Sequence, residues 1–367
     1  MAGRINLRRF WESWHAALFW GAVIMLMLIL IFGCPLVSAQ QPALAPTGRH
    51  VPELARHLER LQLSEPVVSR GLAVYSLQLI DGETLRGSWL TFDRAVSRGV
   101  LRVTEKGASG SVPVVIVENT SRATHVLIMQ GEVISGGKQT RTVRQDVVVA
   151  PGQRIDLNVY CVEQHRWRGE KSFGSANQLV PQSIRKELRR GADQARVWSE
   201  VARNNRALGA ENATGSLELA LKSRVVRDKL SEVRRKIVPE IPRGTTGYIF
   251  VSHGRAVGAE MFGSEEMARE LLPKLLDSYA VDCVLQHGGG FWRDDGRHTA
   301  AVNFYNRMRR VGSERSGTPG SGAGIRTRAE GLLGDGVSLD GVVVHYGIQI
   351  RDRIVPMPKP IIPVPRR

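Results

Sequence analysis

Residues 131–167, GEVISGGKQTRTVRQDVVVAPGQRIDLNVYCVEQHRW, decide the fold because they join two β segments through glycine-containing turns. Gly136 and Gly137 interrupt the chain after an apolar run at residues 126–134. An Ala-Pro-Gly turn then precedes an alternating segment, residues 155–162. The sequence therefore predicts strands connected by tight turns around this stretch.

Polar side chains share one predicted strand face with valines. If residues 139–149 form one extended strand, alternate residues point the same way. The residues of that face are Gln139, Arg141, Val143, Gln145, Val147 and Val149. Buried polar groups need hydrogen-bond partners, and a bound ligand is one source of them. The alternative is a bulge at the glycines, which shifts the register and returns the polar groups to water.

Cys161 is a candidate nucleophile and also a candidate core residue. It alternates with Leu157 and Val159, which predicts burial. Glu163 and His165 follow the strand, and a thiol with a nearby imidazole and carboxylate supplies the groups for covalent catalysis. The catalytic candidates are therefore Cys161, Glu163 and His165, although a salt bridge at the strand end would explain the charges equally well.

The strings GEVISGGKQTRTV, VVVAPGQ and NVYCVEQHRW resemble the core of the ARG and Rhodanese-Phosphatase-superfamily-associated Protein domain, a bacterial family. The resemblance extends through FGSANQLVPQSIR, ARVWSEV, GTTGYIFVSHGRAVGAEMFGS and PKLLDSYAVDC. It covers most of residues 71–283, and it implies a fold and a ligand-facing surface while leaving the chemistry open. The matching positions are Gly131, Glu132, Gly136, Gly137, Lys138, Arg141, Cys161, Glu163, Arg166 and Trp167.

Five of these side chains are the candidates for ligand binding: Glu132, Lys138, Arg141, Arg166 and Trp167. Their chemistry suits an anionic or sugar-like ligand. Backbone amides beside Lys138 could form an anion-binding nest, and an ordinary hairpin turn is the alternative. The stretch lacks the glycine and the Ser or Thr that a phosphate-binding Walker loop requires.

The first 39 residues predict export. Basic residues precede an apolar run at residues 16–32, and Val37-Ser38-Ala39 offers a cleavage site. Residues 1–39 are therefore a signal peptide or an N-terminal membrane anchor, and the protein is expected to be periplasmic, secreted or membrane-anchored. Membrane association through this segment is one expected interaction.

The chain is strongly basic, with a formal net charge of +16. Such a charge attracts an anionic small molecule or an envelope polymer, and export argues against a nucleic-acid partner. A solvated basic surface is the alternative. No cofactor motif stands out, and His125 and His165 do not have the spacing of metal ligands. Pairing of Cys161 with Cys283 stays open, since sequence does not fix their separation.

The fold class is predicted as α+β, with an antiparallel β-sandwich or barrel-like N-terminal half followed by a helical and small α/β C-terminal half. The predicted segments are 40–66, a linker and an amphipathic helix carrying Leu54, Leu58 and Leu61; 67–175, a β-rich core; 176–311, a helical and α/β region; 312–336, a flexible Gly/Ser-rich loop; 337–350, a final strand; and 351–367, a Pro-rich tail. Glu260, Asp282 and His287 lie near predicted element ends and could form an acid/base group.

Three functional hypotheses follow. The first is a ligand-binding or envelope-associated accessory protein, because polar groups are dense at the predicted strand ends. The second is a hydrolase that uses Cys161 or the Glu163/His165 pair. The third is a basic tether to anionic envelope polymers.

Overall fold

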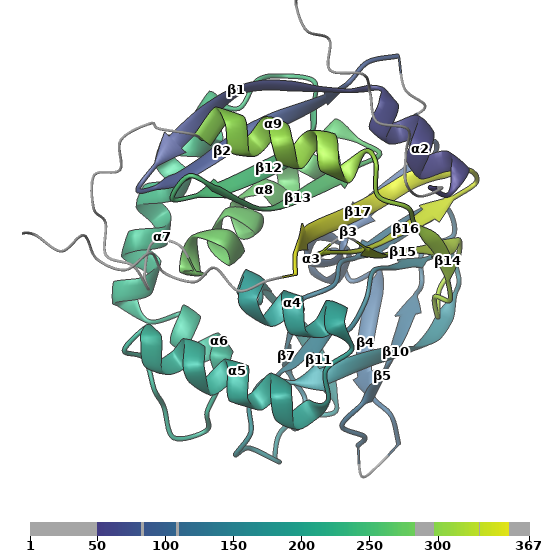
Figure 1. Cartoon of the computed structure of the whole chain (residues 1–367). Helices are drawn as coiled ribbons and strands as arrows, with labels where there is room; N and C mark the ends of the chain where they lie inside the picture. Colours follow the sequence, from purple (N-terminus) through teal and green to yellow (C-terminus); the bar gives the residue numbers. More distant parts are fainter. Residues whose placement is uncertain (1–49, 82–83, 108–109, 283–296, 330, 352–367) are drawn as a thin grey trace, which may run out of the picture. The chain divides into compact units, whose positions relative to one another are not determined.

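The computed structural model describes residues 50–81, 84–107, 110–282, 297–329 and 331–351 (Figure 1). The expected leader, residues 1–39, lies outside these residues, as do residues 352–367 of the expected tail. Among the described helices, none is long and apolar enough to cross a membrane.

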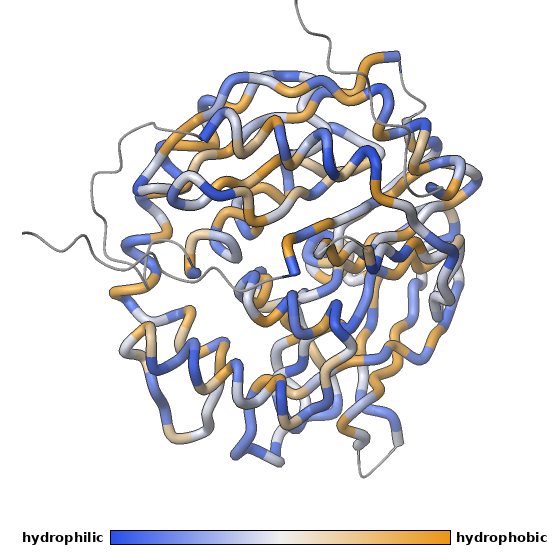
Figure 2. Tube along the Cα trace, viewed as in Figure 1, coloured by the Kyte–Doolittle hydropathy of each residue, from blue (hydrophilic) through white to orange (hydrophobic). Residues whose placement is uncertain are grey.

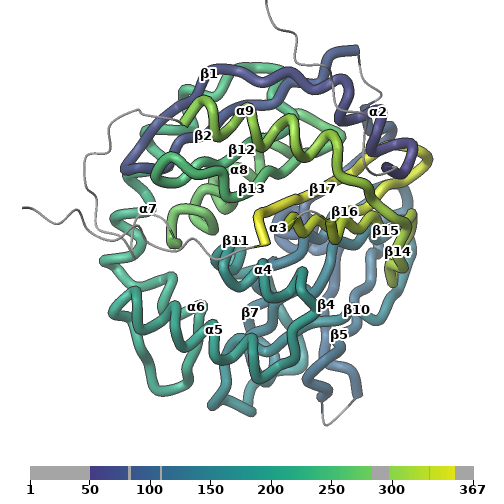
Figure 3. Tube along the Cα trace, in the orientation of Figure 1, coloured from purple at the N-terminus to yellow at the C-terminus, as the bar shows by residue number. Residues whose placement is uncertain are grey.

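The largest element is an eight-stranded antiparallel sheet built from both ends of the described chain. Its strands, in spatial order, are β1 (Leu61–Ser69), β2 (Leu72–Leu79), β12 (Thr245–Ser252), β13 (Arg255–Phe262), β17 (Val342–Ile350), β16 (Leu332–Leu339), β15 (Ala323–Ala329) and β14 (Glu314–Ser316). Helix α2 (Pro52–Glu59) contacts β17, and Figure 3 shows these two distant segments side by side.

Tight hairpins set the register of this sheet. Three two-residue turns have positive φ at both residues, as a type I′ turn requires. They are Arg70-Gly71 (47° and 80°), His253-Gly254 (48° and 75°) and Asp340-Gly341 (50° and 78°).

Helices cover both faces of the sheet. Ile249 and Val251 of β12 belong to one apolar cluster, together with Phe304 of α9 (Arg297–Met308). Phe250 belongs to another, and its ring stacks on Tyr279 of α8 (Glu265–Ala280) with centroids 3.8 Å apart. Alternate residues of a strand point to opposite faces, so the two helices lie on opposite sides. Figure 2 shows α9 alternating between apolar and hydrophilic residues, as expected for a helix with one buried face.

A closed barrel forms the second β element and contains most of residues 131–167. Its strands, in order, are β10 (Arg154–Cys161), β5 (Val114–Asn119), β4 (Leu101–Glu105), β11 (Ser172–Leu179), β7 (Glu132–Gly136) and β8 (Arg141–Val143). A three-stranded sheet accompanies it: β3 (Ser88–Thr91), β6 (Thr124–Ile128) and β9 (Val147–Val149). Apolar side chains from both elements share one core cluster, which includes Val117, Val143 and Leu157.

The other helices are α3 (Phe92–Ser97), α4 (Gln182–Arg190), α5 (Gln194–Ala207), α6 (Leu217–Leu221) and α7 (Arg224–Ile237), with the short 3₁₀ turn η1 (Val238–Glu240). Side-chain caps start several helices. Ser264 accepts a hydrogen bond from the amide of Met267 at the start of α8. The fold is thus α+β with a β-rich N-terminal region that includes a barrel. The C-terminal half differs from the prediction, because strands β12 to β17 join β1 and β2 in one sheet.

The prediction of a flexible loop at residues 312–336 is wrong. This segment contains β14, β15 and the start of β16. Its glycines serve close approach between backbones: a Cβ on Gly324 would lie 2.7 Å from the Ser316 carbonyl oxygen, and one on Gly336 would lie 2.4 Å from the His345 carbonyl oxygen.

Two further expectations are corrected. Leu61 does not extend the first helix, because α2 ends at Glu59 and Leu61 begins β1 opposite Leu79. Residues 139–149 are not one strand either. They divide into β8 and β9, which pair in different sheets, so the predicted common face does not exist.

Candidate functional site

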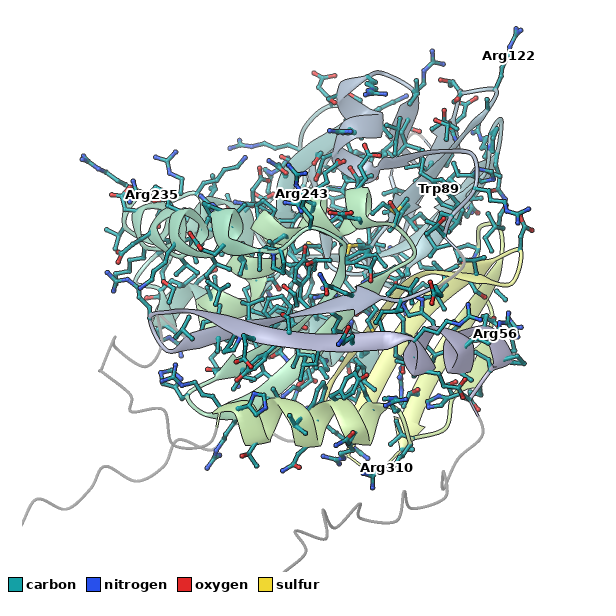
Figure 4. The ribbon with its side chains drawn as sticks, turned by 90° about the horizontal axis from the view of Figure 1, so that it is seen from above. Arg56, Trp89, Arg122, Arg235, Arg243 and Arg310 are labelled. Carbon is teal, nitrogen blue, oxygen red and sulfur yellow. The ribbon has the colours of Figure 1, made fainter. Side chains whose placement is uncertain are left out.

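Two arginines of α4 are buried to an unusual degree. The side chains of Arg185 and Arg189 are 0% and 1% exposed. By contrast, Arg122 and Arg235 point away from the ribbon in Figure 4. A buried guanidinium is costly unless counter-charges and hydrogen bonds surround it. The surroundings of these two side chains therefore identify a built electrostatic site.

Glu260 of β13 is the main counter-charge. Its Oε1 lies 2.6 Å from Nη1 of Arg185 and 3.8 Å from Nη2 of Arg189. Tyr279 of α8 donates its hydroxyl to the same oxygen at 2.7 Å. Burial alone would raise the pKa of Glu260, but Arg185, with His345 and Arg189, lowers it below the usual carboxyl range. Glu260 is therefore a buried carboxylate at neutral pH.

His345 of β17 bridges two buried carboxylates. Its Nδ1 lies 2.6 Å from Oδ2 of Asp146, and its Nε2 lies 3.0 Å from Oε2 of Glu260. Burial favours the neutral ring, but Asp146 and Glu260 outweigh burial and raise the pKa of His345. The imidazole therefore donates from both nitrogens when protonated. It connects the segment between β8 and β9 with the large sheet.

The network has more donors than acceptors. Within the described residues, Nε and Nη2 of Arg185 have no hydrogen-bond partner, and neither do the three guanidinium nitrogens of Arg189. Buried donors without partners cost about 1–3 kcal/mol each, and more when they are charged. Oxygen atoms of a ligand or of ordered water would satisfy them.

Arg189 also contributes to the wall of a cleft of about 350 Å³. We call this the arginine cleft, because the arginines among its lining residues are Arg144, Arg189, Arg190, Arg326 and Arg328. Its carboxylates are Glu314 and Asp335, and Gln130 and Gln145 add amides. Cations therefore outnumber anions in the lining, which gives the cleft a positive potential.

The arginines of the cleft are only partly neutralised. Nη2 of Arg328 lies 3.3 Å from each carboxylate oxygen of Asp335, and Nε of Arg326 lies 3.7 Å from Oδ1. Burial raises the pKa of Asp335 to about 6, while Arg328 opposes this shift. The guanidinium of Arg144 lies 5.7 Å above the ring of Tyr160. Arg328 also donates to the carbonyl oxygens of Thr327, Gly334 and Arg189, so Arg144 is the exposed cleft guanidinium without a counter-charge in the described residues and is free to bind an anion.

The structure brings most of the predicted ligand-binding residues together near Trp167. Nζ of Lys138 lies 5.5 Å from the Trp167 ring centroid, and Cζ of Arg141 lies 5.6 Å from it. Nη2 of Arg166 lies 2.7 Å from Oε2 of Glu163. However, Glu163 also accepts from Thr140, and Arg166 also donates to backbone carbonyls. Arg141 is fully buried. Glu163 and Arg166 therefore bind each other, whereas Nη2 of Arg141 lies 3.9 Å from Oε1 of Glu105 and its Nε has no hydrogen-bond partner in the described residues.

The predicted anion-binding nest holds a carboxylate of the chain itself. The amide of Lys138 donates to Oε1 of Glu105 at 2.9 Å, and the amide of Gly137 donates to the Ser172 carbonyl. The glycine turn thus serves the barrel, by joining β7 to β4 and β11.

Glu132 lies apart from the Trp167 group. Its Oε1 accepts from Nζ of Lys274 at 2.6 Å, and Lys274 also bonds to Asp93 at 2.5 Å. Burial raises the pKa of Glu132 to about 8, against the opposing effect of Lys274. Of the predicted acid/base group, Glu260 belongs to the arginine network, Asp282 accepts from the amide of Ser183, and His287 lies outside the described residues.

The predicted catalytic residues form no open constellation. Cys161 is fully buried, and burial raises the pKa of its thiol. Its Sγ donates to the Glu163 carbonyl at 3.1 Å. The side chain of His165 is exposed, and its backbone amide bonds to Thr214. These positions favour the core interpretation of Cys161. The pairing with Cys283, which the sequence left open, involves a residue outside the described residues.

Sequence reasoning missed Arg185, Arg189 and His345. A signal existed in α4, where the arginines lie one turn apart beside the buried Ile184 and Leu188. His345 also interrupts an otherwise apolar strand, VVVHYGIQI. Within the residues that the structure describes, no group of three or more His, Cys, Asp or Glu side chains is arranged to hold a metal ion.

Comparison with known proteins gives one informative result. No curated protein and no solved structure matches the chain significantly. A family model for the ARG and Rhodanese-Phosphatase-superfamily-associated Protein domain matches residues 60–348, so the resemblance seen in residues 131–167 is confirmed and the chain belongs to this family.

Proposed function

We propose that this protein binds a small anionic molecule in the arginine cleft and acts as a binding protein. One observation carries the proposal: arginines from the β8–β9 segment, α4 and β15 converge on one cleft, and the guanidinium of buried Arg189 has no hydrogen-bond partner in the described part of the chain. Guanidiniums recognise phosphate and carboxylate groups through paired hydrogen bonds.

The dimensions of the site support a small ligand. A cleft of about 350 Å³ lies near the lower end of ligand pockets, which span roughly 300–1,000 Å³. Arg328 is already held by Asp335, which fixes its direction at the cleft wall. Such preorganisation lowers the entropy cost of binding. We favour this cleft over the surface around Trp167 because Arg166 there is already paired with Glu163.

Isothermal titration calorimetry with inorganic pyrophosphate tests the proposal. The wild-type protein is expected to bind one equivalent, and Arg144→Gln is expected to weaken binding about tenfold, equivalent to about 1.4 kcal/mol. Arg144 is exposed at the cleft, so its replacement leaves the core intact.

Arg154→Gln is the matched control, since Arg154 is an exposed arginine of β10 outside the cleft lining. Its affinity for pyrophosphate is expected to equal that of the wild type. Equal weakening by both substitutions, or by neither, contradicts a site in the cleft.

Export is part of the proposal. Its support is the leader pattern in residues 1–39 and the basic composition. An envelope location would place the arginine cleft near anionic polymers and small phosphorylated molecules. Deletion of residues 1–39 is expected to retain the protein in the cytoplasmic fraction, and unchanged fractionation would contradict export.

A basic tether to anionic envelope polymers is the second candidate. It is supported by exposed arginines that point outward, among them Arg122 and Arg235 (Figure 4). A tether predicts polymer binding that weakens steeply with salt and survives Arg144→Gln. Specific binding in the cleft predicts that the same substitution removes most of the affinity, so one titration series distinguishes the two.

A further inference from the structure

We infer that the protein has a second ligand site, which takes an amphipathic anion: a molecule with an apolar or aromatic body and one acidic group. The site is a pocket of about 470 Å³ between β11, α6, α7 and α8. We call it the helix pocket. It shares no lining residue with the arginine cleft, so it goes beyond the function proposed above.

The floor of the helix pocket is apolar. Its buried lining residues include Ala176, Leu179, Leu221, Leu230 and Val281. They belong to the main apolar cluster of the sheet and helices, so the floor is held by the core. Burial of apolar ligand surface against such a floor contributes roughly 25 cal/mol per Å².

The rim of the pocket is cationic. Lys222, Arg227, Arg234 and Lys274 line it, against one lining carboxylate, Asp277. Nη1 of Arg234 lies 2.5 Å from Oδ1 of Asp277, and Nζ of Lys222 lies 2.6 Å from Glu218. Arg227 is exposed, and the described part of the chain gives it no ion pair. Arg227 is therefore the rim cation that can pair with an acidic group of a ligand.

Lys274 is the buried cation of the pocket lining. It is buried and bonds to Glu132 and Asp93 at 2.6 and 2.5 Å. Burial would lower the pKa of Lys274, but the two carboxylates raise it, so the ammonium stays charged.

Asn177 marks the edge of the pocket with an unusual backbone. Its φ is 54°, and the pairing of β11 with β7 shifts register between Ser175 and Leu179. A bulge of this kind re-aims side chains, and strained residues are concentrated at ligand sites. The bulge opens the strand where the pocket forms. An apolar floor and a cationic rim together select a ligand with an apolar body and an acidic group.

Titration with 8-anilinonaphthalene-1-sulfonate, an aromatic sulfonate whose fluorescence rises on transfer from water, tests this inference. We expect saturable binding of one equivalent to the full-length protein at pH 7. Arg227→Glu is expected to weaken it at least tenfold, because the reversed charge repels the sulfonate. The exposure of Arg227 makes this variant compatible with folding.

Arg224→Glu is the matched control, with the same charge change on the same helix. Arg224 is outside the pocket lining, and its side chain is 88% exposed. It should bind the probe as the wild type does. Arg144→Gln should also bind it normally, which separates this site from the arginine cleft. Absence of saturable fluorescence, or equal affinity of Arg227→Glu and Arg224→Glu, would overturn the inference.

Discussion

Asp335 sets the sign of the pH dependence in the arginine cleft. It faces Arg326 and Arg328 of β15, with Arg189 and Asp146 close enough to affect its titration. Because its pKa is about 6, the carboxyl is neutral at pH 5 and charged at pH 7. A negative charge in the cleft opposes a bound anion.

We therefore expect sulfate affinity to fall roughly tenfold between pH 5 and pH 7, since a like charge nearby disfavours the anion by about 1.4 kcal/mol. Sulfate is the probe because it stays a dianion over this range. Calorimetric titration should show that Asp335→Asn binds more tightly at pH 7 and has a flatter profile. An identical profile in the variant and the wild type would contradict this role of Asp335.

His345 makes the free energy of unfolding fall as the pH rises. Ordinary acid denaturation is the opposite case, in which stability is lost as the pH falls. Its pKa in the folded protein is raised, so its contribution is complete below the unfolded value of 6.5 and is lost as pH rises through the folded value. Removal of the imidazole leaves Asp146 and Glu260 as buried carboxylates without their shared donor.

His345→Gln is expected to lower the free energy of unfolding by about 3–5 kcal/mol at pH 6, the usual cost of breaking a buried charge pair. The loss should shrink at pH 9, because the wild-type ring is then closer to neutral. Urea denaturation at both values measures this, with the exposed His165→Gln as control. A loss that is equal at both pH values would show that His345 acts through packing alone.

The sequence predicted which polar side chains around Trp167 lie close together, but not which residues from other strands bond to them. Lys138, Arg166 and Trp167 lie together because short turns connect their strands, and the sequence shows those turns. The carboxylate that accepts from the Lys138 amide, Glu105, comes from β4, 33 residues before Lys138. Nothing local to residues 131–167 indicates that partner, whereas the Glu163–Arg166 pair is local and a salt bridge at the strand end was one interpretation of the sequence.

At the scale of elements, the glycine turn between β7 and β8 is the most constrained feature of the barrel. Gly137 has a φ of +53°, and a Cβ there would lie 2.1 Å from the Phe173 ring. Gly152 has a φ of +71°, but no atom lies within 4 Å of its Cβ position. Both glycines have a positive φ, but only Gly137 lacks the room for a Cβ atom.

Gly137→Ala should therefore lose more than about 3 kcal/mol of unfolding free energy, from backbone strain and overpacking together. Gly152→Ala should lose only the backbone part, about 1–2 kcal/mol. Urea denaturation of both variants provides the comparison. If the two losses are equal, the contact with Phe173 does not constrain the turn.

Local chemistry explains which elements the sequence could predict. The His253-Gly254 and Asp340-Gly341 turns and the Ser264 cap depend on adjacent residues alone. Strand β14 depends on pairing with β15, and β15 on pairing with β16, while Gly324 of β15 allows close approach of the β14 backbone. Glycine that serves close packing and glycine that serves flexibility look the same in one sequence.

At the scale of the whole described unit, buried charges tie distant elements together. His345 and Asp146 are 199 residues apart in sequence, and His345 and Glu260 are 85 apart. The large sheet likewise pairs β2 with β12 and β13 with β17. Such long-range pairings carry no local signal. This is why the sequence indicated barrel strands and helices but neither the eight-stranded sheet nor the arginine cleft.

Anomalous diffraction from crystals of the protein grown with selenate, a tetrahedral dianion like sulfate, tests the anion site in the arginine cleft most directly. A selenium peak is expected within hydrogen-bonding reach of Arg144 and Arg328, and it should disappear in crystals of Arg144→Gln. Selenium peaks confined to exposed arginines outside the cleft, such as Arg122 or Arg235, would contradict the site.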